Sequence, residues 1–189
     1  MTESILQDVL ERETEMFLSV PTDGPCGCKD HLDSFLLNRR VQFLTWSEEA
    51  LSSYRDDLVY AKTDGRNLMT YKYARMGGQL PCENADPLID AIVRQQMEWQ
   101  GALFKAYPAF MRRARPLRTS QDGDGKTSFE TYFRAELESF SATTLASLFR
   151  EIERKKTAGI NMSEETYELL LKEKGLPPLA EMERRMGTA

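Results

Sequence analysis

The sequence predicts an all-α protein in which two four-helix units follow one another along the chain. Apolar residues recur at the spacing of amphipathic helices, and strand-like alternation is absent. Helix-capping residues and helix-ending glycines recur at matching places in the two halves. With 189 residues, the chain has the length of one domain. We expect a single helical domain over 1–189, built from repeats 3–77 and 86–175, with 176–189 as a C-terminal tail.

The internal repeat is visible when the sequence is shifted by 94 residues. Positions 34–67 then lie on 128–161 without a gap, and ten of the 34 positions are identical, against roughly two expected from average residue usage. The first helices of the two units match at a shift of 83 instead, which places an insertion of eleven residues within 107–126. We therefore predict two duplicated units related by pseudo-two-fold symmetry.

The first unit is expected to contain four helices. Ser47 and Asn67 are good N-cap residues for the third and fourth, and Gly65 has the position of a C-cap glycine. A run of proline and glycine over 21–27 predicts the loop between the first two helices. The expected helices cover about 5–17, 32–46, 48–64 and 68–76.

The second unit repeats this pattern. Asp86 followed by Pro87 is typical of a helix start, and Thr127 with Glu130 has the spacing of a capping box. Ser141 and either Asn161 or Ser163 can cap the next two helices. A short C-terminal helix is expected after the two prolines at 177–178. The expected helices of this unit begin near 87, 128, 142 and 162.

The composition excludes several classes of protein. No apolar stretch has the roughly 18 residues that a membrane helix needs, and the acidic N-terminal segment does not resemble a signal peptide. The net charge of −5 makes nucleic-acid binding unlikely. Three cysteines without a secretory signal favour reduced thiols and a cytoplasmic location.

Familiar catalytic motifs are also missing. The sequence contains no P-loop, no dinucleotide-binding glycine motif and no G-x-S-x-G. His31 is the only histidine, so any mechanism that needs an imidazole must use it. A di-iron site of the helical-bundle type requires Glu-x-x-His on two helices, and none occurs. The sequence does not decide whether the protein is an enzyme, and we favour a protein without catalytic activity.

A repeated polar pair is the best candidate for a ligand site. Arg40 and Arg134 occupy equivalent positions among apolar residues, and Glu15 and Glu98 are equivalent acids that can pair with them. These residues form either duplicated structural ion pairs or a pocket between the repeats that binds an anionic ligand. The aromatic residues that can line such a pocket are Trp46, Tyr73, Tyr132 and Trp99.

A second candidate site is a cysteine-containing loop. Cys26, Cys28 and His31 lie close together and are residue types that bind zinc or iron, with Cys82 or Asp30 as a fourth ligand. Zinc sites usually contain a second pair of ligands, which the sequence lacks. An ordinary loop with reduced cysteines is the alternative, and no cofactor is favoured.

Several motifs resemble one uncharacterised family. These are Trp46-Ser47, GRNLM at 65–69, KYARM at 72–76, TSFETY at 127–132, and a cysteine followed closely by aspartate at 28–30. They are similar to domain of unknown function 4125, a bacterial family frequent in anaerobes. The resemblance covers nearly the whole chain and implies a shared fold and a bacterial cytoplasmic origin. It supplies no activity and no catalytic residues.

Three hypotheses for function remain. The first is a non-catalytic binding or adaptor module with a protein partner. The second is a small enzyme or small-molecule-binding protein with an anion-binding pocket between the repeats. The third is a metal-handling protein that uses Cys26, Cys28 and His31. A deep polar pocket that holds both Arg40 and Arg134 favours the second hypothesis, whereas a shallow exposed surface favours the first.

Overall fold

The computed structural model describes residues 2–21, 31–123 and 125–187, and their regular structure is helical apart from one isolated bridge between Gly123 and Lys126. The prediction of an all-α fold is confirmed. The helices of the first half are α1 (Thr2–Leu18), α2 (Leu32–Leu44), α3 (Glu48–Thr63) and α4 (Leu68–Met76). Those of the second half are α5 (Pro87–Ala106), α6 (Pro108–Met111), η2 (Thr119–Gln121), α7 (Phe129–Leu137), α8 (Ala142–Thr157), α9 (Met162–Glu173) and α10 (Leu179–Gly187).

The predicted caps set most of these helix ends. Ser47 and Asn67 accept hydrogen bonds from the first-turn amides of α3 and α4, and Asn161 does the same for α9. Gly65 ends α3 with φ +68°, a conformation that favours glycine. One cap differs from the prediction: Ser128, not Thr127, caps α7, because its side chain accepts from the amide of Thr131.

The segment expected to hold the insertion contains α6 and η2 between α5 and α7. Its end is fixed to α7 by Asp122. That carboxylate accepts hydrogen bonds from the backbone amide of Ser128 and the hydroxyl of Thr131, at 2.6 and 2.5 Å. Asp122 therefore joins the end of this segment to the start of α7.

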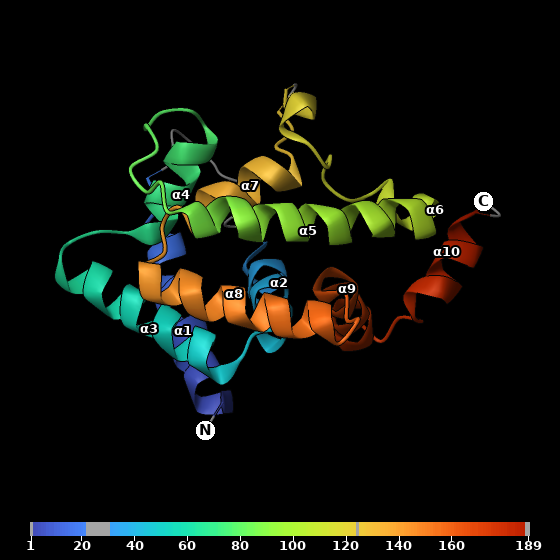
Figure 1. The fold of residues 1–189 in the computed structure, drawn as a ribbon, viewed down its shortest axis with the longest axis horizontal. Coiled ribbons are helices and arrows are strands. Elements are labelled where there is room, and N and C mark those ends of the chain that lie inside the picture. The colour runs from blue at the N-terminus through green and yellow to red at the C-terminus, as the bar shows by residue number, and fades with distance from the viewer. Residues whose placement is uncertain (1, 22–30, 124, 188–189) are drawn as a thin grey trace.

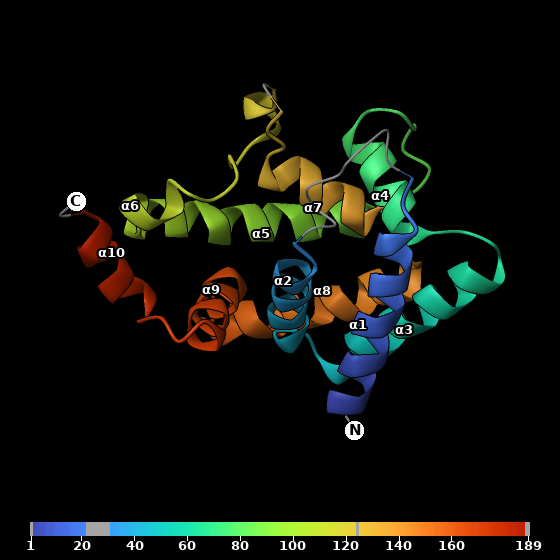
Figure 2. The ribbon, with the colours of Figure 1, turned by 180° about the vertical axis from the view of Figure 1, so that it is seen from behind.

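The long helices cross in two groups (Figure 1). α1 packs against α2, α3 and α4, and α5 packs against α7, α8 and α9. The groups meet where α3 contacts α8, where α2 contacts α9, and where α4 contacts α7. Seen from behind, α2 lies between α9 and α1 (Figure 2). The two halves of the chain therefore pack directly against each other.

One hydrophobic core joins both halves. It draws buried side chains from α1 to α5 and from α7 to α9. Aromatic residues that follow α2 and α7 meet one from α3: Trp46 and Tyr54 both contact Phe140, with ring centroids 5.9 and 4.7 Å away. The same packing holds α2 and α7 in fixed positions beside α5 and α9.

A smaller apolar cluster anchors the C-terminal helix. Leu179 of α10 is fully buried against Leu103, Met111 and Leu171. The carboxylate of Glu183 accepts hydrogen bonds from two backbone amides at the start of α6, at 2.9 and 2.7 Å. The predicted C-terminal helix is therefore present and is packed at the end of α5, far from α1 (Figure 1). Among the described residues, no helix combines the length and apolar character needed to cross a membrane.

Candidate functional site

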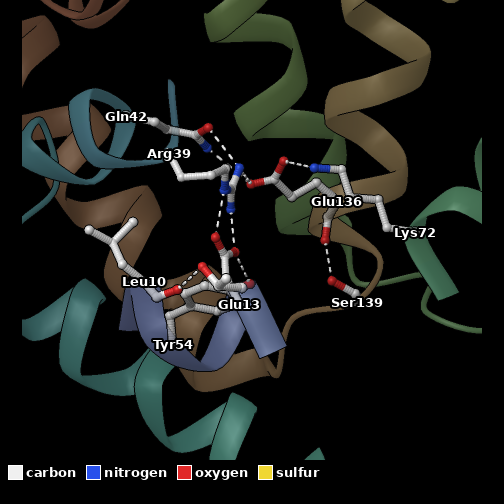
Figure 3. Close-up of polar contacts among 9 residues, drawn as sticks. Leu10, Glu13, Arg39, Gln42, Tyr54, Lys72, Glu136 and Ser139 are labelled. Atoms are coloured by element: carbon white, nitrogen blue, oxygen red, sulfur yellow. Dashed lines mark hydrogen bonds and ion pairs between the residues drawn. The ribbon is translucent and has the colours of Figure 1, made fainter. Parts of the chain in front are cut away.

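Four charged side chains meet inside the core, from α1, α2, α4 and α7 (Figure 3). Arg39 forms two parallel hydrogen bonds with Glu13, from Nε to Oε2 at 2.7 Å and from Nη2 to Oε1 at 2.6 Å. Its Nη1 also donates to Oε1 of Glu136 at 2.9 Å. Lys72 completes the set by donating to the other oxygen of Glu136 at 2.6 Å. We call Glu13, Arg39, Lys72 and Glu136 the buried charge network.

Neutral side chains fill the remaining hydrogen-bonding positions. The hydroxyl of Tyr54 donates to Oε1 of Glu13 at 2.6 Å. The amide of Gln42 donates to Glu136 at 3.0 Å and its oxygen accepts from Arg39 at 2.8 Å. Among the described residues, no side-chain nitrogen or oxygen that is sealed from solvent is left without a partner. The network is therefore closed, with two cations and two carboxylates.

Helical spacing explains why these charges point inward. Arg39 lies one turn from Phe35 and one turn from Phe43, so it shares their apolar face. Glu13 lies in the same way between Val9 and Phe17 on α1. The four charged side chains are only 0–3% exposed. A charge buried this deeply must be paired, which the network achieves.

The electrostatics favour the charged forms of Glu136 and Arg39 and the protonated form of Tyr54. Burial alone would raise the pKa of Glu136, but Arg39 and Lys72 outweigh it and lower that pKa to about 2. Burial also opposes the charge on Arg39, yet Glu13 and Glu136 raise its pKa well above the ordinary value. Burial and the charge on Glu13 raise the pKa of Tyr54, so its phenol stays protonated and donates.

The hydroxyl of Tyr54 offers a direct test of this arrangement. We expect Tyr54→Phe to lower the free energy of unfolding by about 1–3 kcal/mol, because Glu13 then loses one of its buried donors. Urea denaturation followed by circular dichroism measures this change. Tyr60→Phe is the control, since Tyr60 lies on the same helix but is 64% exposed; we expect a change within about 0.5 kcal/mol. Equal effects of the two substitutions would contradict the assignment.

A cavity of about 740 Å³ adjoins the network, and Arg39 and Gln42 form part of its wall. It lies among α2, α5, α7 and α9, with contributions from α1 and α4. Its lining residues are Phe17, His31, Ser34, Phe35, Asn38, Arg39, Val41, Gln42, Thr45, Trp46, Tyr73, Gln96, Gln100, Arg115, Phe129, Tyr132, Phe133, Leu148, Met162, Ser163, Thr166, Tyr167 and Leu170.

The cavity has a polar rim and a largely apolar inner wall. Its exposed residues are His31, Ser34, Asn38 and Arg115, and the others are buried or half-buried. One inner polar residue differs from the rest. Gln100 is only 7% exposed and makes no hydrogen bond to any described residue.

Tyr132 connects the cavity to the buried charge network. The ammonium of Lys72 lies 3.8 Å from the centre of its ring, and the guanidinium carbon of Arg115 lies 4.9 Å from it. One aromatic ring of the cavity wall thus interacts with two cations. Lys72 is bound to Glu136, whereas Arg115 donates one hydrogen bond, to the backbone oxygen of Thr127 at 3.2 Å.

The residues proposed from the sequence are only partly brought together. Trp46, Tyr73 and Tyr132 line the cavity, whereas Trp99 packs against the hydrophobic core instead. The expected pairing of the repeated arginines with the repeated glutamates is wrong. Neither Arg40 nor Arg134, nor Glu15 or Glu98, belongs to the described cavity wall.

The repeated arginines form ion pairs on the surface. Arg40 binds Glu3 at 2.9 Å and Arg134 binds Asp90 at 2.8 Å. Both guanidinium side chains are more than 30% exposed and both acids more than 60%. The reason is rotational: a residue next to Arg39 is turned by about 100° around the helix, away from the core. Glu15 binds Lys62, and Glu98 is exposed.

The metal hypothesis stays a prediction. Cys26 and Cys28 lie outside the described residues, and His31 is exposed at the rim of the cavity. Cys82 is a free, exposed cysteine whose thiol donates to the backbone oxygen of Asn84. Within the described part of the chain, no group of three or more His, Cys, Asp or Glu has a metal-binding arrangement.

A second cavity, of about 810 Å³, lies near the start of α4. Its wall includes Asp57, Arg66 and Glu138. These groups already have partners: Glu138 binds Arg75, Arg66 binds Asp64, and Asp57 accepts from the backbone amide of Ser141. The first cavity is the stronger candidate, because its wall includes Gln100, whose amide has no hydrogen-bond partner among the described residues.

Comparison with known protein families identifies the family of this chain. The family described as "Protein of unknown function (DUF4125)" matches residues 3–184. The chain belongs to this family. The resemblance inferred from the motifs at 65–76 and 127–132 is thereby confirmed. Comparison with curated proteins gave no match, and comparison with solved structures gave none either. The DUF4125 description assigns no activity, so the function has to be inferred from the geometry of the site.

Proposed function

We propose that this DUF4125 protein binds a small organic molecule in the cavity among α2, α5, α7 and α9. Ligand sites in proteins are usually concave, about 300–1,000 Å³ in volume, and mostly apolar with a few polar groups. The cavity here has a volume of about 740 Å³, an aromatic inner wall and a polar rim. This favours a small-molecule site over a shallow adaptor surface, but the site lacks Arg40 and Arg134, around which the sequence hypothesis placed the pocket.

The unpartnered amide of Gln100 is the observation that carries the proposal. The residue is only 7% exposed, and because no sealed side-chain nitrogen or oxygen of the described residues lacks a partner, its amide must be reached from solvent. Gln96, one turn earlier on the same face of α5, is bound by Ser163 at 2.9 Å. Gln100 lines the cavity and has no hydrogen-bond partner among the described residues. A molecule bound there can pair with this amide.

We also propose that the chain is one domain, 1–189, made of two duplicated units with pseudo-two-fold symmetry. The packing of α1 on α2, α3 and α4 has a counterpart in α5 on α7, α8 and α9. Asn67 donates to the backbone oxygen of Met16, and the equivalent Asn161 donates to that of Trp99. A hydrogen bond joins Gln42 to Glu136, which are equivalent at the 94-residue shift. Contact between equivalent residues is what a two-fold axis produces.

The duplication accounts for the place of the cavity. Equivalent residues from both halves line it, namely Phe35 with Phe129 and Tyr73 with Tyr167. The halves differ at two other lining positions, where Phe17 is matched by Gln100 and Arg39 by Phe133. This supports a site between the repeats in which the polar groups arose by divergence.

A cavity-filling substitution tests the proposed function. The probe is phenylnaphthylamine, a neutral aromatic amine whose fluorescence rises in apolar surroundings. We expect Thr166→Phe to weaken its binding about tenfold or more, which corresponds to about 1.4 kcal/mol. Thr166 lines the cavity, and the added ring occupies space that the probe needs. Fluorescence titration measures both affinities.

Thr157→Phe is the matched control. Both threonines donate to the backbone oxygen four residues earlier at 2.9 Å, but Thr157 is exposed at the end of α8. We expect it to bind the probe as the unmodified protein does. A probe that binds Thr166→Phe with unchanged affinity would overturn the proposal and leave the adaptor hypothesis as the alternative.

A further inference from the structure

We propose that the ligand of this cavity is an aromatic anion whose acidic group pairs with Arg115 at the rim. This inference rests on the proposed function, because it specifies the chemical class that the same cavity binds. It follows from the charge of the wall, the free donors of Arg115 and the aromatic surface beside that residue.

Among the described residues, the wall of the cavity contains arginines and no acid. The chain has 30 Asp and Glu against 25 Lys and Arg, yet none of the described lining residues is Asp or Glu. Two arginines, Arg39 and Arg115, are among them. Such a wall carries no negative charge that would repel an anion, and its arginine side chains can donate hydrogen bonds to one.

The buried charge network does not alter this balance. Its two carboxylates are paired with Arg39 and Lys72, so the network as a whole carries no net charge. Arg39 reaches the cavity wall, but its donors already serve Glu13, Glu136 and Gln42. The charge available to a ligand therefore comes from Arg115.

Arg115 has the free donors that an acidic group needs. It forms no ion pair with any described residue, and its one hydrogen bond goes to a backbone oxygen. A guanidinium has five N–H groups in a planar fork that fits a carboxylate or phosphate. The ring of Tyr132 lies beneath this guanidinium and limits its orientations. Ordering by the ring lowers the entropic cost of binding an anion.

The surface beside Arg115 favours an aromatic body for the ligand. Phe35, Phe129 and Tyr132 all line the cavity and are only half-buried, so part of each ring faces it. Aromatic rings prefer to pack against one another in offset or edge-to-face geometry. A molecule with a ring and an acidic group can contact this surface and Arg115 together.

A matched pair of probes tests the inference. Anilinonaphthalene sulfonate carries the same two aromatic groups as phenylnaphthylamine and adds one sulfonate. We expect the sulfonate probe to bind at least about tenfold more tightly, because a hydrogen-bonded ion pair forms at Arg115. We expect Arg115→Gln to remove this preference, because it should weaken binding of the sulfonate probe far more than binding of the neutral probe. Energy transfer from Trp46, which lines the cavity, reports binding at this site.

Arg113→Gln is the control variant, since Arg113 is exposed two residues away and does not line the cavity. It should keep the preference for the sulfonate. Salt gives a second measurement on the unmodified protein: the affinity for the sulfonate probe should fall as sodium chloride rises, and that for the neutral probe should not. Equal binding of the two probes, or equal effects of the two variants, would overturn the inference alone. Failure of both probes to bind would instead overturn the proposed function.

Discussion

Replacing Arg39 with methionine is expected to lower the free energy of unfolding by about 3–5 kcal/mol. The substitution leaves Glu13 and Glu136 buried with one fewer cation, and Lys72 contacts only the second of them. An unpaired buried carboxylate must either be desolvated or take up a proton at an unfavourable pH. Chemical denaturation at neutral pH, followed by circular dichroism, gives the change directly.

Arg40→Met is the matched control, because it removes the same side chain from the neighbouring position of α2. Arg40 is 34% exposed and its partner Glu3 is 68% exposed, so its ion pair is weak. We expect this variant to change the free energy of unfolding by less than about 1 kcal/mol. If the two substitutions were equally harmful, the network would not be the main electrostatic support of the core.

The contrast between these two arginines shows what the sequence can predict. Helix ends depend on local chemistry, so Ser47, Asn67 and Gly65 are sufficient to place the limits of α3 and α4. Packing of an amphipathic face also follows from local spacing. The all-α fold and most helix boundaries are predictable from the sequence for these reasons.

The buried charge network could not be predicted from the proposed repeat. The repeat draws attention only to polar residues that are the same in both halves. Arg39 is equivalent to Phe133 at the 94-residue shift, and Glu13 is equivalent to Gln96 at the 83-residue shift. The network lies at positions where the two halves differ, so a search for residues that are identical in both halves does not find it. A different signal is present: Glu13 and Arg39 each lie one turn from two apolar residues on the same face.

The cavity is predictable only in part. The aromatic candidates Trp46, Tyr73 and Tyr132 do line it. Tyr73 and Tyr132 lie on α4 and α7, whose apolar spacing is visible in the sequence, and Trp46 directly follows α2. Gln100 and Arg115 have no distinguishing signal, since each resembles an ordinary polar residue of a helix or loop. Their importance depends on how α5 and the segment before α7 lie beside α2 and α9, which is a property of tertiary packing.

Acid is expected to weaken the protein through Glu136 over a defined range of pH. The folded pKa of this group is about 2, against an ordinary value of 4.5. A carboxyl whose pKa is lowered by folding stabilises the protein fully above the unfolded pKa, and the contribution is lost as pH falls toward the folded pKa. The difference corresponds to about 3 kcal/mol, lost as the pH falls from about 4.5 to 2.

Urea denaturation at a series of pH values from about 6 to 2 measures this loss, and two variants assign it. Glu136→Gln cannot titrate, so its stability should be lower at neutral pH and should fall by about 3 kcal/mol less across the acidic range. Glu98→Gln removes an exposed glutamate and should leave the curve unchanged. Lys72→Met removes one of the two cations that lower the pKa of Glu136, so the acid loss should begin at higher pH. Parallel curves for all of these proteins would mean that the network does not govern acid stability.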